Sequence, residues 1–235
     1  PALMLRSLLT DLQGGAGFPA DRLADWSAWS DYCVAAGLLV SPALDQQVSA
    51  ADVIRTAARL TNAAPVWTGG QLKMVPYADG AESGNGRTFT PDLTPAYDLD
   101  DECYVPQPDS PPVRCALKSP AERKNHHRVE CLERDQGYSP SIAEAKDTAD
   151  IDANGLRTAD TLQAHWICST LIGRKVVQIE LQRSLAVCAE YTFVLPEHYA
   201  LLEPADLVTL TDATLQLQRD GARITVIEEG ADGEL

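Results

Sequence analysis

The sequence predicts an α+β fold in which the strands pair in antiparallel fashion. Apolar residues recur at helical spacing through the first 64 residues, and strand-like alternation dominates after residue 65. A helical excursion at about 139–185 separates the earlier strands from the later ones. Because helices and strands do not alternate as they do in a parallel sheet, we expect a helical subdomain at 1–64 and a β-rich, barrel-like domain at 65–235.

Three helices are expected in the first 64 residues. The first carries leucines at helical spacing and ends at the glycines of 14–17. The second follows Pro19 and stops at Gly37, and the third begins at Ser49, a favourable N-cap residue, with Asp52 in its first turn. The predicted buried faces are Leu5, Leu8, Leu9 and Leu12; Trp29, Tyr32, Cys33 and Ala36; and Val53, Ile54, Ala57, Ala58 and Leu60.

The β-rich part opens with a hairpin. In "APVWTGGQLKMVPY" (64–77) the two glycines permit the positive φ of a tight turn. We expect a flexible loop at 78–87 and a proline-rich connector at 91–112. Further strands are expected at 113–118, 128–132, 189–196, 205–212 and 222–229, and helices at 141–155 (a polar helix or helix-plus-turn) and 169–183.

The net charge restricts the partners. The chain carries a formal charge of −15, whereas a nucleic-acid surface needs Lys and Arg to displace the counterions of phosphates. The same acidity disfavours docking on an anionic membrane. No apolar run approaches the roughly 18–20 residues of a membrane span. We therefore expect no specific nucleic-acid binding and no membrane insertion.

One acidic stretch matches half of a calcium-binding loop. Asp150, Asp152, Asn154 and Gly155 fit the first half of an EF-hand loop, but the twelfth position, which should be a bidentate Glu, is Thr161. Half-motifs of this kind are common in acidic turns. We therefore expect a solvated turn here and no calcium site.

The histidines give no complete metal site. His126 and His127 are adjacent, so on a strand they point to opposite faces. His165 and Cys168 could meet on a helix, but no further ligands are near. We expect free thiols at the six cysteines, Cys33, Cys103, Cys115, Cys131, Cys168 and Cys188, since no C-x-x-C pair occurs.

No catalytic motif stands out. The acidic run "DLDDE" (98–102) is typical of a solvated loop, and "GNG" (84–86) lacks the context of a dinucleotide site. There is no G-x-S-x-G turn and no P-loop. The apolar surroundings of Trp26, Trp29, Trp67 and Trp166 indicate core packing. The residues therefore predict no catalytic, cofactor-binding or metal-binding position.

The order of several phrases resembles the hub region of phage tail tip proteins. These are "DVIRTAARLTNAAPVWTGGQLKMV" (52–75), "PPVRCALKSPAERKNHHRVEC" (111–131), "SIAEAKDTADIDANGLRTAD" (141–160) and the stretch 179–212, whose "LLEPADLVTLTD" is the nearest match. The family includes the host-specificity protein of lambda-like phages and the large tail-fibre-like protein of gene transfer agents. Its "AADYC" phrase corresponds here to "WSDYC" with Tyr32 and Cys33, whereas Asn154 replaces a usual Tyr.

The resemblance implies a structural role. Family members contribute barrel-like domains to a ring, usually trimeric, that continues the tail tube at the distal end of the virion tail. It implies other tail-tip and tail-tube proteins as partners, no cofactor, and a longer parent chain. The acidity would then suit a channel to which DNA does not adhere.

Two alternatives remain open at this stage. A cell-wall hydrolase module would need a cleft with clustered carboxylates or a Cys–His pair. A host-receptor or glycan-binding module would show an exposed aromatic patch. The sequence predicts neither feature.

Overall fold

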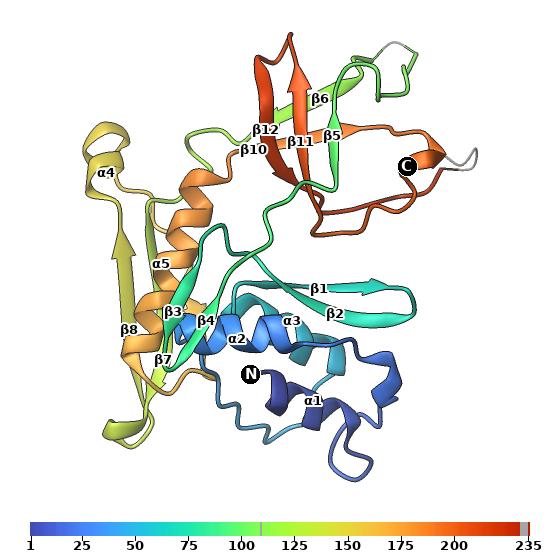
Figure 1. Cartoon of the computed structure of the whole chain (residues 1–235). Coiled ribbons are helices and arrows are strands. Elements are labelled where there is room, and N and C mark those ends of the chain that lie inside the picture. Colours follow the sequence, from blue (N-terminus) through green and yellow to red (C-terminus); the bar gives the residue numbers. More distant parts are fainter. Residues whose placement is uncertain (109, 231–234) are drawn as a thin grey trace. The chain divides into compact units, whose positions relative to one another are not determined.

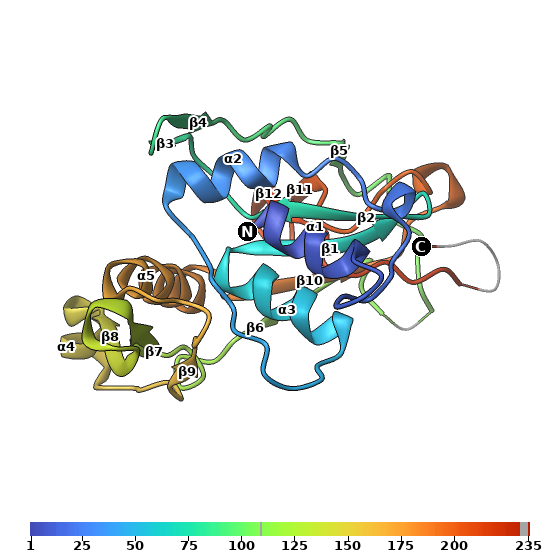
Figure 2. The ribbon, with the colours of Figure 1, turned by 90° about the horizontal axis from the view of Figure 1, so that it is seen from below.

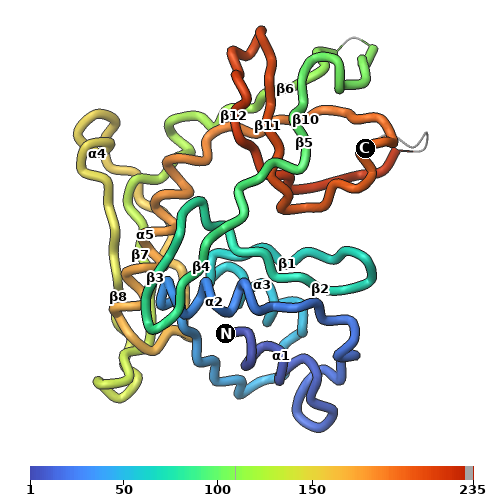
Figure 3. The backbone as a smooth tube through the Cα atoms, viewed as in Figure 1, coloured from blue at the N-terminus to red at the C-terminus, as the bar shows by residue number. Residues whose placement is uncertain are grey.

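The computed structural model describes residues 1–108, 110–230 and 235, which form two compact units (Figure 1). Unit 1 comprises Pro1–Pro91 and Ser119–Cys188, and unit 2 comprises Asp92–Lys118 and Ala189–Leu235. Figure 3 shows the path of the chain, which enters unit 2, returns to unit 1 and enters unit 2 again. The predicted connector 91–112 and the C-terminal stretch include residues 109 and 231–234, which lie outside the described residues.

The boundary between the units differs from the predicted division at residue 64. The helices of 1–64 bury their apolar side chains in one cluster with residues such as Val129, Cys131 and Val177. These side chains belong to unit 1 although they follow residue 65. Whether residues 1–64 also fold as a separate subdomain stays a prediction.

Three helices and a hairpin build the first part of unit 1, and their ends are set by local sequence. Ser49 accepts a hydrogen bond from the Asp52 amide at 3.1 Å, and Gly37 ends a helix with φ 72°. Gly69 and Gly70 have φ 55° and 75° in the hairpin turn. These elements confirm the sequence prediction. They are α1 (Ala2–Thr10), the 3₁₀ turn Ala20–Arg22, α2 (Ser27–Ala36), α3 (Ala50–Leu60), β1 (Ala63–Thr68) and β2 (Gln71–Pro76).

The predicted flexible loop at 78–87 is a second, short hairpin of β3 (Glu82–Gly84) and β4 (Arg87–Phe89). It lies against the C-terminal end of α2, where the Asn85 amide group donates to the Val34 carbonyl at 2.9 Å. A Cβ on Gly84 would lie 2.5 Å from the Ala35 carbonyl oxygen. The loop prediction was wrong because these stabilising contacts come from a helix about 50 residues earlier.

A three-stranded sheet covered by a helix forms the rest of unit 1, as Figure 2 shows. Strand β8 pairs antiparallel with β7, and the two-residue β9 pairs parallel with β7. The elements are β7 (His126–Glu133), the 3₁₀ turn Arg134–Gln136, β8 (Ser139–Lys146), α4 (Thr148–Asn154), β9 (Leu162–Gln163) and α5 (Thr170–Ala186).

The helix predicted at 141–155 is therefore correct only in its second half. Residues up to Lys146 form β8, and α4 begins after Asp147, whose side chain caps it. Alanine, glutamate and lysine favour helix locally, but continuous pairing of β8 with β7 overrides this weak preference.

Helix α5 packs closely on the sheet at Gly173. A Cβ there would lie 3.2 Å from Cys131 Sγ and 3.3 Å from Ala143 Cβ. We expect Gly173→Val to lower the free energy of unfolding by about 1–3 kcal/mol, because the added methyl groups would overpack this contact. Urea unfolding followed by circular dichroism measures the change. The control is Arg174→Val, which introduces the same side chain on the exposed side of α5. Gly155→Val would not serve, because the φ of Gly155 is 78° and valine would be strained there. A loss of stability for Gly173→Val no larger than that for Arg174→Val would contradict the prediction.

Unit 2 contains two small sheets in the order β12-β11-β5 and β10-β6. β11 pairs antiparallel with β12 but parallel with β5, so the pairing is not wholly antiparallel. The last strand of unit 2, β12, ends at Arg223, whereas the predicted strand covers 222–229. The elements are β5 (Tyr97–Leu99), β6 (Val113–Leu117), β10 (Ala189–Phe193), the 3₁₀ turn Glu197–Tyr199, β11 (Leu207–Asp212) and β12 (Leu217–Arg223).

Strand β11 is the centre of unit 2. Val208 and Leu210 are fully buried, as the alternation of "LVTLTD" predicts. On the other face, Thr209 donates to the Asp98 carboxylate, which also accepts two bonds from Arg219 at 2.9 and 2.8 Å. The architecture is thus mixed α+β, and within the described residues no sheet closes into a barrel.

Candidate functional site

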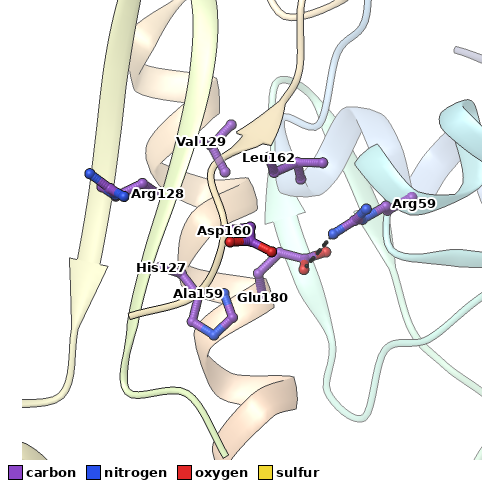
Figure 4. A pocket seen from close by; sticks show the side chains of 8 residues that line it. All are labelled: Arg59, His127, Arg128, Val129, Ala159, Asp160, Leu162 and Glu180. Carbon is purple, nitrogen blue, oxygen red and sulfur yellow. Dashed lines mark hydrogen bonds and ion pairs between the residues drawn. The ribbon is translucent and has the colours of Figure 1, made fainter. Parts of the chain in front are cut away.

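Unit 1 contains a cavity of about 170 Å³ between α3, β7, the segment before β9, and α5 (Figure 4). Its polar lining consists of Arg59, His127, Asp160 and Glu180. Val129, Ala159 and Leu162 form apolar walls. The guanidinium of Arg128, which also borders the cavity, points away from it across β7.

Secondary structure places each polar group. His127 lies on the same face of β7 as Val129 and Cys131, which are buried, so its ring is turned toward α5. Glu180 is in the third turn of α5, and Arg59 is in the last turn of α3. Arg59 Nη2 and Glu180 Oε2 are 3.3 Å apart and form an ion pair.

His127 is partly buried. Burial lowers the pKa of its imidazole, against smaller raising effects of Glu180 and of a hydrogen bond to the Lys124 backbone. Nε2 is enclosed by protein atoms and has no partner among the described residues.

The cavity does not contain a ready metal site. Asp160 is exposed and forms no hydrogen bond or ion pair with the described residues. Within that part of the chain no group of three His, Cys, Asp or Glu side chains is placed to hold a metal ion. Sequence reasoning did not find this cavity, because Arg59 and Glu180 are 121 residues apart and no motif links them.

The residues of the calcium half-motif form a closed hydrogen-bond network instead. Asp150 accepts from Asn125 Nδ2 at 2.7 Å and Asn154 Nδ2 at 2.9 Å, and it pairs with Arg157. Asn125 is fully buried; it also donates to the Gly155 carbonyl at 2.8 Å and accepts from the Arg157 amide at 2.7 Å. The carboxylate thus has three protein donors, and the segment is a helix rather than an open loop.

This network predicts a pH dependence. The hydrogen bond from Asn125, and then those from Arg157 and Asn154, lower the pKa of Asp150. A carboxyl group with a lowered folded-state pKa contributes stability above its unfolded pKa of about 4 and loses it as the pH falls through the folded value. We therefore expect Asp150→Asn to destabilise the chain at pH 7, and the difference from wild type to shrink below about pH 4. Urea midpoints at pH 7, 4 and 3 measure this, and a difference independent of pH would contradict it.

The remaining histidine candidates lie apart from the cavity. His126 points to the other face of β7, with Nε2 3.3 Å from Glu144 and Nδ1 3.1 Å from Thr158. His165 Nε2 is 2.8 Å from Glu130. Cys168 Sγ is 3.9 Å from the Ser41 carbonyl oxygen, so His165 and Cys168 have different partners. All six cysteines are free thiols, and only Cys33 and Cys131 are buried.

The tryptophan prediction was wrong for one residue. Trp26 and Trp29 are buried and Trp166 is partly buried, but 54% of Trp67 is exposed. Trp67 lies at the end of β1 with Phe18 against it, the ring centroids being 6.2 Å apart. A position near a hairpin turn explains the exposure, because few residues can cover it there.

The other two sequence candidates have local structural roles. The first two residues of "DLDDE" end β5, where Leu99 is buried, and the other three lie in an exposed turn in which Asp100 accepts from the Glu102 amide at 3.1 Å, so the predicted solvated loop is confirmed only for 100–102. "GNG" forms the turn of the β3–β4 hairpin. None of the described helices combines the length and apolar character needed to cross a membrane.

Comparisons with known proteins identify the family. The model of a family described as putative phage tail protein matches residues 49–227. A chain of the virion of a native gene transfer agent (GTA) particle has the same fold, with a TM-score of 0.65 and 16% identity over 97% of this chain and 51% of that chain. None of the curated proteins compared with the chain gives a significant match.

Two prophage tail proteins are more distant in structure. The 43 kDa tail protein of prophage MuSo2 from Shewanella oneidensis has a TM-score of 0.48 and 14% identity, covering 77% of this chain and 50% of that chain. Prophage tail protein gp18 from Listeria monocytogenes EGD-e has a TM-score of 0.37 and 10% identity, covering 74% and 46%. The chain therefore spans about half the length of the structures it matches. From the family match over 49–227, the chain belongs to the phage tail protein family, whose place is the virion tail.

Proposed function

We propose that this chain is a structural part of the hub at the tail tip or baseplate of a phage or prophage particle. In this role it forms part of the ring and channel used in host attachment and DNA delivery. The observation that carries the proposal is the fold shared, along nearly the whole chain, with a chain of a gene transfer agent virion. The phrase order noted in the sequence supports the hub as the location within the tail.

A ring, with three copies as the expected number, would also account for the incomplete sheets. Within the described residues each sheet has two or three strands and leaves strand edges free. Such edges are available for pairing with another chain. We propose that neighbouring copies, together with tail-tube and tail-tip proteins, complete a barrel-like wall.

The distribution of charge supports a channel role for unit 2. Residues 92–118 and 189–235 carry 16 acidic and 4 basic side chains, a formal charge of −12, which leaves −3 for unit 1. A wall of this sign repels the phosphates of passing DNA. The hypothesis requires unit 2 to face the channel, and a channel lined mainly by Lys and Arg would contradict it.

Electron microscopy of assembled particles tests the location. The hairpin turn at Gly69–Gly70 is the place for a short epitope in the full-length parent protein, because a Cβ added at either glycine would meet no atom within 4 Å. Gold-labelled antibody should mark only the distal end of the tail. Label along the tube or on the head would contradict the proposal.

Contact with a host-surface glycan is a second candidate, favoured by the exposed Trp67 beside Phe18. If it is correct, Trp67→Ala particles should adsorb less to host cells, whereas Leu156→Ala, which alters another exposed apolar side chain, should not. Equal adsorption of both variants would remove this candidate. We propose no enzymatic activity; release of cell-wall fragments by the purified chain would contradict this and support the hydrolase alternative.

A further inference from the structure

His127 lies where three elements of unit 1 meet. Its side chain borders the cavity between α3, β7, the segment before β9, and α5 (Figure 4). Nε2 is closed off from water and has no hydrogen-bond partner among the described residues. If the ring becomes an imidazolium, both of its nitrogens carry a proton, whichever of them carried it before. Nε2 would then hold a charged N–H with no acceptor in place, which costs more than a neutral nitrogen left unpaired.

The charged groups around the ring do not offset this cost. From α3, the Arg59 guanidinium faces the same cavity, and its positive charge opposes a second one. From α5, Glu180 favours the imidazolium, but its carboxylate is already paired with Arg59 at 3.3 Å. Asp160, in the segment before β9, also faces the cavity but is exposed, so water weakens its attraction for the ring.

The neighbours of His127 on the sheet do not favour the charged form either. His126 lies on the opposite face of β7, and its charge would oppose that of His127. Arg128 points away from the cavity, and the β8 residue opposite His127 is the apolar Ala145. A hydrogen bond to the Lys124 backbone favours the charged form, but less than burial disfavours it. Burial therefore holds the pKa of His127 below the ordinary histidine value of about 6.5.

We propose that His127 is an acid-sensitive latch that holds α3 and the segment before β9 against β7 and α5. The neutral ring fits the closed arrangement, and protonation opens it. Above about pH 6.5 the ring is neutral in both the folded and the unfolded chain, so the latch stays closed. As the pH falls below that value, the unfolded chain takes up the proton first, and the closed state loses stability. The cavity of about 170 Å³ beside the ring admits water once these contacts loosen.

An NMR titration of the folded chain tests the latch directly. The His127 ring signal should titrate below pH 6.5. Arg59→Gln should move the midpoint upward, because it removes the opposing charge and leaves Glu180 without its partner. The matched control is Arg55→Gln on the same helix, which removes an exposed arginine that pairs with Asp52 and does not line the cavity. It should leave the midpoint unchanged, and a wild-type midpoint at or above 6.5, or equal shifts in the two variants, would overturn the proposal.

Stability and hydrogen exchange measure the opening. Between pH 7.5 and 5.5 the urea midpoint of the wild type should fall more than that of His127→Gln. His198→Gln, which removes an exposed histidine of unit 2, should follow the wild type. Over the same range, amide exchange corrected for its intrinsic pH dependence should become faster in α3. Equal pH dependence of wild type and His127→Gln, or unchanged exchange in α3, would overturn the latch. The NMR titration uses the wild-type ring, so it decides the proposal even where His127→Gln fails to fold.

Discussion

Replacing Trp29 by alanine should lower the free energy of unfolding by about 3–5 kcal/mol. Trp29 has no exposed surface, and its Nε1 donates to Thr61 Oγ1 at 3.1 Å. It also packs edge-on against Trp26, with ring centroids 5.7 Å apart. The substitution therefore creates a large cavity where α2 meets α3, and it leaves part of the Thr61 hydroxyl's bonding capacity unused.

Trp67→Ala is the matched control, because it removes the same side chain from a site that is 54% exposed. We expect it to change the stability by less than about 1 kcal/mol. Urea unfolding followed by far-ultraviolet circular dichroism measures both variants without depending on tryptophan fluorescence. Similar losses for the two variants would show that the core of unit 1 is not organised around Trp29.

Replacing Asn125 by alanine should cost about 2–3 kcal/mol. Asn125 is fully buried, and its side chain makes three hydrogen bonds, to Asp150, Gly155 and Arg157. Alanine would leave the Gly155 carbonyl and the Arg157 amide without these partners. The loss exceeds that of an ordinary exposed hydrogen bond because the Asn125 side chain is fully buried and three bonds, one of them to a carboxylate, are lost together.

Asn154→Ala serves as its control, because Asn154 is exposed and makes a single bond to the same carboxylate. We expect a loss of about 0.5–1 kcal/mol for this variant. Urea unfolding in 5 mM CaCl₂ and in EDTA extends the comparison. Equal losses for the two asparagines would refute the network, and a calcium-dependent increase in stability would restore the calcium hypothesis.

The elements that the sequence predicts well have signals inside a few neighbouring residues. Ser49 and Ser169 cap the helices that follow them, Gly37 ends a helix, and Gly69 with Gly70 turns a hairpin. In each case one or two neighbouring residues set the end of the element: a serine side chain accepts a hydrogen bond from a helix N–H, or a glycine adopts the positive φ that the end or turn requires. The α+β class follows from the order of such elements.

The elements that the sequence predicts poorly depend on distant partners. The β3–β4 hairpin lies against α2, and β8 is held by β7 against its helical preference. The spacing of Ile172, Val176, Ile179 and Arg183 predicts one buried stripe on α5, and Val176 is indeed buried. The helix contacts both the sheet and the helical part, so its buried surface is wider than that stripe. Its most buried residues are therefore Gly173, Val176, Val177 and Leu181.

The cavity could not be predicted from the sequence for the same reason. Its groups come from α3, β7, the segment before β9, and α5, which only the tertiary fold brings together. The sequence did separate His126 from His127 by the alternation of a strand, and the structure agrees, since only His127 lines the cavity. The sequence predicts only one side of the Asn125 network. The acidic residues of 150–155 stand out as a half-motif, but no motif marks the donors Asn125 and Arg157.

A cryo-electron microscopy reconstruction of the tail assembled with the full-length parent protein is the most direct test of the proposed role. The account predicts this chain at the distal end, in a ring of three copies around the channel, with unit 2 contributing acidic side chains to the channel wall. Finding the chain outside the channel wall, in a lateral fibre or as a single peripheral copy would contradict it.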